Sequence, residues 1–167
     1  MRLSDKRRSV PSTRRWKRDR LKLASESETI ALGERIGRKL KPGALVLLRG
    51  PLGAGKTTLA RGLARGAGYR GRVSSPTFAL AHVYRGKRLT VHHLDLYRLA
   101  RGEHLEVGIE ELLEDPRAAV VVEWPAAAGG RWPKDRLVIT LAHVRGGRRA
   151  ALKATGLPAR KILESLP

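Results

Sequence analysis

The chain has 167 residues, of which 41% are hydrophobic and 30% charged, and its formal net charge is +20. This length predicts one ordinary domain. No apolar run approaches the roughly 18 residues of a membrane span, and no apolar stretch follows the basic N-terminus, so we expect neither a transmembrane segment nor a signal peptide. Cysteine is absent, which excludes disulfides and thiolate-bound zinc and fits the cytoplasmic location that we expect.

The excess of Lys+Arg over Asp+Glu, 35 against 15, is the strongest compositional signal. Most of these basic residues are arginine, whose planar donor fork suits phosphate, so nucleic acid is a candidate partner. The sequence also contains neither Asn nor Gln, which indicates a general bias toward arginine. Both interpretations of the charge stay open.

The first predicted segment is a basic arm. Residues 1–24 carry ten Lys or Arg side chains against two Asp and show almost no apolar periodicity. Such a composition cannot bury enough apolar surface to fold, so we predict a disordered N-terminal arm here. Residues 25–167 are then predicted to form a single domain.

The domain begins with a predicted helix, a strand and a second helix. Ser25 and Ser27 are candidate N-caps for a helix that Lys41-Pro42-Gly43 ends. Residues 44–50 form a short apolar run bounded by glycine, which predicts a buried strand, and residues 55–66 follow with a helical pattern.

The rest of the chain alternates between predicted strands and helices. Helices are expected over 104–115 and at the C-terminal end, and strands over residues 80–86, 89–97, 118–124, 135–144 and 149–155. This alternation predicts an α/β fold of the P-loop NTPase type, with a mixed, largely parallel sheet flanked by helices.

The segment between the first strand and the second helix matches G-x-x-x-x-G-K-[ST] at every position. Glycines let backbone N–H groups converge on an anion, the lysine reaches the β- and γ-phosphates, and the threonine hydroxyl can bind Mg²⁺. The residues predicted to bind nucleotide are Gly50, Pro51, Leu52, Gly53, Ala54, Gly55, Lys56, Thr57 and Thr58.

A nucleoside triphosphatase also needs a carboxylate near its metal, and two strand ends supply candidates. Asp95 follows one apolar run, and Glu123 follows a run of small and β-branched residues typical of a central strand. Each could instead be an ordinary carboxylate paired with an arginine. For the adjacent His92 and His93 a structural role is favoured over metal binding. Trp124 could lie in the core or support a nucleotide.

Five motifs occur together in this chain in a characteristic order and spacing. They are GPLGAGKTTLARG at 50–62, SPTF at 75–78, HLDLYRL at 93–99, GIEE at 108–111 and EWP at 123–125. Over about residues 25–155 the chain therefore resembles the TsaE family, small bacterial P-loop ATPases of tRNA threonylcarbamoyladenosine biosynthesis.

The resemblance implies roles for particular residues. Thr57 and Glu123 would be the Mg²⁺ ligands, with ATP or ADP bound through Lys56 and the loop. Asp95 would act in hydrolysis, and Thr77 matches a switch-type threonine near the γ-phosphate. Glu26, Thr29 and Arg148, which match the family less strongly, would lie beside the nucleotide. The family commonly has Asp where this chain has Pro51, which puts nucleotide affinity and the partner contact in question.

The resemblance also implies the functional setting. The partners would be homologues of TsaB and TsaD, with TsaD transferring the threonylcarbamoyl group to adenosine 37 and this chain supporting repeated turnover through weak, partner-stimulated ATP hydrolysis. Contact with tRNA would be indirect or through the basic surface, and neither DNA nor a membrane is expected. The alternatives are a small-molecule kinase and a basic RNA-binding module that senses nucleotide. A GTPase is disfavoured because the chain has no Asn for the NKxD motif.

Overall fold

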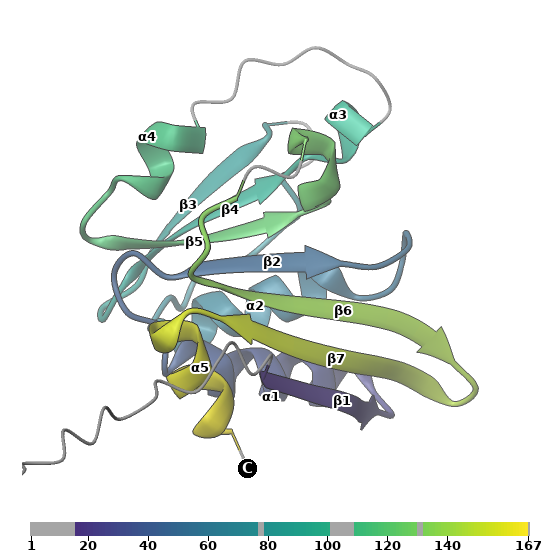
Figure 1. Ribbon diagram of the computed structural model, residues 1–167. Helices are drawn as coiled ribbons and strands as arrows, with labels where there is room; N and C mark the ends of the chain where they lie inside the picture. Colours follow the sequence, from purple (N-terminus) through teal and green to yellow (C-terminus); the bar gives the residue numbers. More distant parts are fainter. Residues whose placement is uncertain (1–15, 77–78, 101–108, 130–131, 167) are drawn as a thin grey trace, which may run out of the picture.

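The computed structural model describes residues 16–76, 79–100, 109–129 and 132–166 (Figure 1). Its strands are β1 (Trp16–Leu23), β2 (Leu45–Arg49), β3 (Ala81–Arg85), β4 (Thr90–Asp95), β5 (Ala118–Glu123), β6 (Arg136–Val144) and β7 (Gly147–Thr155). Its helices are α1 (Glu26–Gly37), α2 (Lys56–Gly66), α3 (Tyr97–Ala100), α4 (Ile109–Leu113), the 3-10 helix η1 (Pro125–Ala128) and α5 (Leu157–Glu164).

All seven strands form one sheet in the order β1-β7-β6-β2-β5-β4-β3. The four central strands, β6, β2, β5 and β4, run parallel to one another. Antiparallel strands complete both edges, β7 and β1 on one side and β3 on the other. The predicted α/β fold with a mixed sheet is therefore confirmed, with the parallel pairs confined to its centre.

Two apolar clusters lie on opposite faces of the sheet because strand side chains alternate. The first cluster joins the sheet to α1, α2 and α5, and it includes Leu32, Leu63 and Ile162. The second is smaller and packs α3, α4 and η1 over β2, β4 and β5. This second cluster also includes Val138 of β6 and Ala81 of β3, but no described residue of β1 or β7.

The contact between α1 and α2 is made by glycines. A Cβ atom on Gly33 would lie 2.5 Å from the Leu59 carbonyl oxygen, and one on Gly62 would lie 2.8 Å from the Gly33 Cα. Cβ atoms on Gly37 and Gly66 would likewise meet the backbone of the facing helix. The two helices can approach this closely only because these positions carry no side chain.

The prediction of a disordered arm over residues 1–24 is wrong for Trp16–Leu23, which forms β1 at the edge of the sheet. Antiparallel pairing with β7 supplies backbone hydrogen bonds that do not depend on hydrophobic side chains, and Leu23 is buried in the first cluster. The charge of this segment hid its short alternating pattern. Residues 1–15 lie outside the described part of the chain.

Several predicted boundaries also shift. Ser25 caps α1, accepting a hydrogen bond from the Glu28 amide, so the alternative cap at Ser27 is not used. The strand predicted over 89–97 ends at Asp95, and α3 begins at Tyr97. Of the helix predicted over 104–115, the described residues show only Ile109–Leu113.

No helix among the described residues is long and apolar enough to cross a membrane.

Candidate functional site

A pocket of about 240 Å³ opens where the central parallel strands end. Its lining comes from the loop between β2 and α2, the start of α2, the segment before β3, the ends of β4 and β5 with the residues that follow them, and β7. The residues that line it are Leu52, Gly53, Gly55, Lys56, Thr57, Thr58, Ser75, Asp95, Tyr97, Glu123, Trp124 and Arg148. Clefts at the carboxyl ends of parallel strands are the usual ligand sites of open α/β sheets.

The loop before α2 has the conformation that an anion cradle requires. Gly50, Gly53 and Gly55 all have positive φ angles, of 140°, 74° and 99°. Gly55 is the N-cap of α2 and makes no side-chain capping hydrogen bond. The positive end of the α2 dipole therefore points into the pocket, where it favours negative charge.

Lys56 is buried, and its ammonium is held by the loop itself. Its Nζ donates to the carbonyl oxygens of Gly50, at 2.9 Å, and Pro51, at 2.8 Å. The same Nζ lies 4.1 Å from the centroid of the Trp124 ring, within the range of a cation–π contact. Burial lowers the pKa of Lys56, while the carboxylates of Glu123 and Asp95 oppose that shift.

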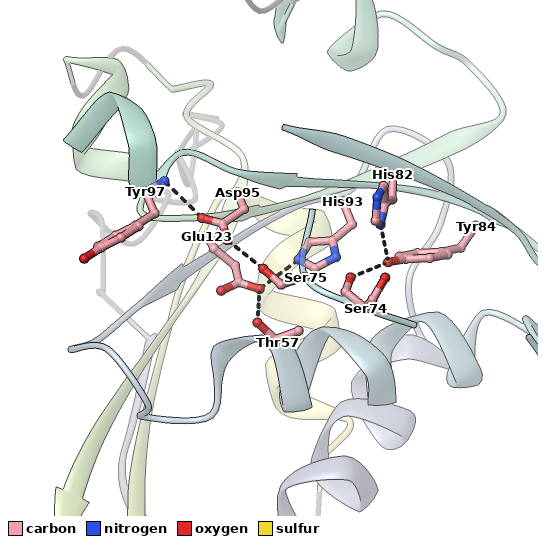
Figure 2. A network of polar contacts seen from close by, with 9 residues as sticks. All are labelled: Thr57, Ser74, Ser75, His82, Tyr84, His93, Asp95, Tyr97 and Glu123. Carbon is pink, nitrogen blue, oxygen red and sulfur yellow. Dashed lines mark hydrogen bonds and ion pairs between the residues drawn. The ribbon is translucent and has the colours of Figure 1, made fainter. Parts of the chain in front are cut away.

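Asp95 and Glu123 are cross-strand neighbours, because β4 and β5 are parallel and pair these two residues in register. The Asp95 carboxylate accepts from the Ser75 hydroxyl at 2.9 Å and from the Tyr97 amide at 3.0 Å. Both carboxylates are buried, and both line the pocket that the loop between β2 and α2 also lines; Figure 2 shows the two side chains close to each other. The two carboxylates found in the sequence are thus brought to one place by register.

Thr57 and Glu123 form the candidate metal pair. The Thr57 hydroxyl donates to Glu123 Oε1 at 2.9 Å, and His93 Nε2 donates to the same oxygen at 2.9 Å (Figure 2). Both of these hydrogen bonds go to Oε1 of Glu123, and no described residue donates to its Oε2. Mg²⁺ prefers oxygen ligands and usually keeps several bound waters. The Thr57 hydroxyl and the Glu123 carboxylate are such ligands, so this pair fits that ion.

Arg148 provides a second cation at the cradle, with a half-buried side chain. A Cβ atom on Gly55 would lie 2.8 Å from Arg148 Nε, so the guanidinium lies against the first residue of the helix cap. Nε is buried with no hydrogen-bond partner in the described part of the protein. A buried guanidinium N–H that faces an anion cradle fits a phosphate or carboxylate ligand.

The structure does not bring every predicted residue into the pocket. Glu26 pairs instead with Arg61 at 2.9 Å, and Thr29 is buried behind Arg148, whose Nη1 is 3.5 Å from its hydroxyl. Gly50, Pro51 and Ala54 shape the loop without lining the pocket, although two of them hold Lys56 through their carbonyls. Thr77 lies outside the described residues.

Sequence reasoning missed three residues of this site. His93 was assigned a structural role, yet it contacts Glu123; its spacing of two from Asp95, which puts both on one face of β4, was the available signal. Ser75 and Tyr97 hold Asp95 from outside its strand. At Trp124 the backbone turns away from β5, because its φ is 58°. The Trp124 ring therefore contacts Lys56, which favours a role in the nucleotide site over a place in the core.

Comparisons with known proteins agree on one family. A family model described as "Threonylcarbamoyl adenosine biosynthesis protein TsaE" matches residues 23–151. A Treponema pallidum protein named tRNA threonylcarbamoyladenosine biosynthesis protein TsaE is 38% identical over 126 residues, which cover 75% of this chain and 92% of that protein. A Streptomyces coelicolor protein of the same name is 41% identical over 119 residues, covering 69% and 79%.

A solved structure supports the same fold. The crystal structure of YdiB from Bacillus subtilis superposes with a TM-score of 0.77 at 25% sequence identity, covering 90% of this chain and 93% of that one.

Proposed function

The chain belongs to the TsaE family of tRNA threonylcarbamoyladenosine biosynthesis proteins, and from this premise we propose that it is a Mg²⁺-dependent ATPase that supports turnover of a TsaB–TsaD complex in the cytoplasm. The observation that carries the proposal is the convergence of Lys56, Thr57, Asp95 and Glu123 in one pocket at the ends of the parallel strands. These are the parts that phosphoryl transfer requires, namely a phosphate cradle, a metal site and a group to position water.

Binding would begin at the loop. The backbone amides at the start of α2, together with Lys56 and Arg148, would receive the β- and γ-phosphates. Thr57 and Glu123 would hold Mg²⁺, which supplies charge neutralisation at the phosphate oxygens. Trp124 would keep the Lys56 ammonium at the edge of the cradle, since the ring already lies beside it.

Hydrolysis would depend on Asp95. In that step a water oxygen bonds to the γ-phosphorus, the bond from this phosphorus to the bridging oxygen of ADP breaks, and the water proton leaves. Asp95 is fixed by Ser75 and by the Tyr97 amide, so its carboxylate is already oriented to hold that water and accept its proton. A buried, preoriented carboxylate costs little reorganisation during the reaction.

A reconstituted tRNA modification assay tests this proposal. With the two partner proteins, excess tRNA and ATP, the chain should raise the number of modification turnovers. The Asp95→Asn and Glu123→Gln variants should fold normally and lose ATP hydrolysis by at least about a hundredfold, because each removes a charge that acts on water or metal. Hydrolysis is measured as free inorganic phosphate.

Three results would contradict the proposal. Repeated modification that is indifferent to this chain would refute the supporting role, and normal turnover by both variants would refute the assigned chemistry. Phosphate recovered on a metabolite instead of in solution would indicate a kinase.

His93 is proposed as a positioning residue for Glu123. Replacing it by alanine should raise the Mg²⁺ concentration that half-maximal hydrolysis requires by about 10- to 100-fold, because the carboxylate loses the donor that fixes one of its oxygens. His93→Gln, which keeps a donor, should recover part of the loss. His92→Gln is the matched control, since His92 pairs with Asp115 on the other face of β4. An unchanged Mg²⁺ dependence in His93→Ala would refute the role.

A further inference from the structure

The sheet carries a basic face on the side opposite α1, α2 and α5. It is formed by the basic side chains that β1, β2 and β7 present there, around the small residues Thr140 and Ala142 of β6; we call the basic members, Lys22, Arg49, Arg149 and Lys153, the basic sheet face. Lys22, Arg49 and Arg149 are exposed, and Lys153 is half-buried.

Strand alternation places these side chains together. Ala150 and Leu152 of β7 are buried in the first cluster under the helices, so Arg149 before them and Lys153 after them point to the opposite face. Register pairs Lys22 of β1 with Arg149 directly. The second cluster, which holds α3, α4 and η1, includes Leu45 and Leu47 of β2 and Val138 of β6 but no described residue of β1 or β7.

The charge of the β6–β7 part of this region has one sign, while β1 carries four basic residues and Asp19. The β6–β7 segment, residues 136–155, contains five Lys or Arg residues and no Asp or Glu. Lys22 and Arg149 are cross-strand neighbours, so their Cβ atoms lie about 5 Å apart. Lys153 lies four residues further along β7, about 13 Å from Arg149. The paired cations Lys22 and Arg149 repel each other, and a polyanion would relieve that repulsion.

We propose that the basic sheet face binds the phosphate backbone of RNA. Protein interfaces bury a core of aromatic and large apolar side chains, whereas nucleic-acid interfaces are polar and strongly basic. The centre of this face holds Thr140 and Ala142, and the segment 136–155 contains no Phe, Tyr or Trp. RNA is the occupant because proteins of this family are named for tRNA threonylcarbamoyladenosine biosynthesis. Since segment 136–155 has no ring to stack on a base, the binding should not depend on base sequence.

The face lies next to the pocket. Arg148 lines the pocket on one side of β7, and Arg149, the following residue, lies on the basic sheet face. Strand β7 would therefore contact both the nucleotide, through Arg148, and the RNA, through Arg149. RNA binding itself needs no nucleotide, so it is measured without ATP, and failure of the ATPase proposal would not obscure the result.

The test is fluorescence anisotropy of the full chain with a labelled tRNA transcript and with a labelled polyuridine RNA over a range of salt concentrations. The Lys22→Ser, Arg149→Ser double variant should bind both RNAs at least about tenfold more weakly at 0.1 M salt, and the slope of log affinity against log salt should fall by about two. The matched control is Arg85→Ser, Lys87→Ser, which removes the same charge from exposed positions at the far edge of the sheet. It should bind almost as tightly as the unaltered chain.

Four outcomes would overturn the proposal. The unaltered chain could fail to bind either RNA. Both double variants could lose affinity equally, which would show that net charge alone is responsible. The face variant could keep its RNA affinity but lose binding to TsaB or TsaD, which would make the face a protein interface. Duplex DNA of matched length could bind more tightly than tRNA. Unchanged thermal unfolding of both variants is the control for folding.

Discussion

Replacing Lys56 by alanine should lower ATP hydrolysis by at least about a thousandfold, because the residue supplies positive charge where charge develops on the transferred phosphate. The side chain is buried beside the Glu123 and Asp95 carboxylates, and its ammonium donates to the loop carbonyls of Gly50 and Pro51. No other described lysine lines this pocket. Neither solvent nor a neighbouring lysine can therefore replace it.

The measurement is steady-state phosphate release, with nucleotide affinity determined separately by titration. Lys41→Ala is the matched control, because Lys41 is exposed at the opposite end of the sheet. Thermal unfolding of the Lys56→Ala variant and of the unaltered chain should be compared as well, since the variant also loses the two hydrogen bonds from Lys56 to the loop. Turnover within a few-fold of the unaltered chain would show that the cradle is not the reactive site.

Replacing Gly62 by valine should destabilise the fold by about 3 kcal/mol, which for a domain of this size lowers the melting temperature by about 6 to 12 °C. A Cβ atom at this position would lie 2.8 Å from the Gly33 Cα and 3.0 Å from the Glu34 amide nitrogen, and it would also meet the Ile30 carbonyl. These atoms are backbone, so neither helix can yield without moving away from the other.

The control for this variant is Arg65→Val on the exposed side of the same helix, where we expect a cost below about 1 kcal/mol. Valine has a higher helix propensity than glycine, so any loss at Gly62 must come from the helix contact. Denaturant unfolding followed by circular dichroism measures both variants. Equal stability of Gly62→Val and the unaltered chain would mean that α1 and α2 are not held together by this close contact.

The pocket also shows why a loop motif is not a site by itself. The sequence pattern includes Gly50, Pro51 and Ala54, but the pocket is lined by their neighbours, and these three act through backbone shape. Pro51 keeps its carbonyl contact with Lys56 although it replaces the usual Asp, because that contact needs no side chain. We therefore expect the substitution to affect what meets the outer surface of the loop more than the phosphates inside it.

By itself the sequence determined the strand–loop–helix around Lys56, the burial of the strands that end at Asp95 and Glu123, and the family, because each depends on local pattern and on residue types at fixed spacing. The tertiary structure alone decided how these parts meet. Parallel register set Asp95 beside Glu123, the left-handed backbone at Trp124 brought its ring to Lys56, and pairing with β7 turned the basic segment Trp16–Leu23 into an edge strand. Cross-strand neighbours and backbone hydrogen bonds join residues far apart in the chain, so no window of sequence contains them.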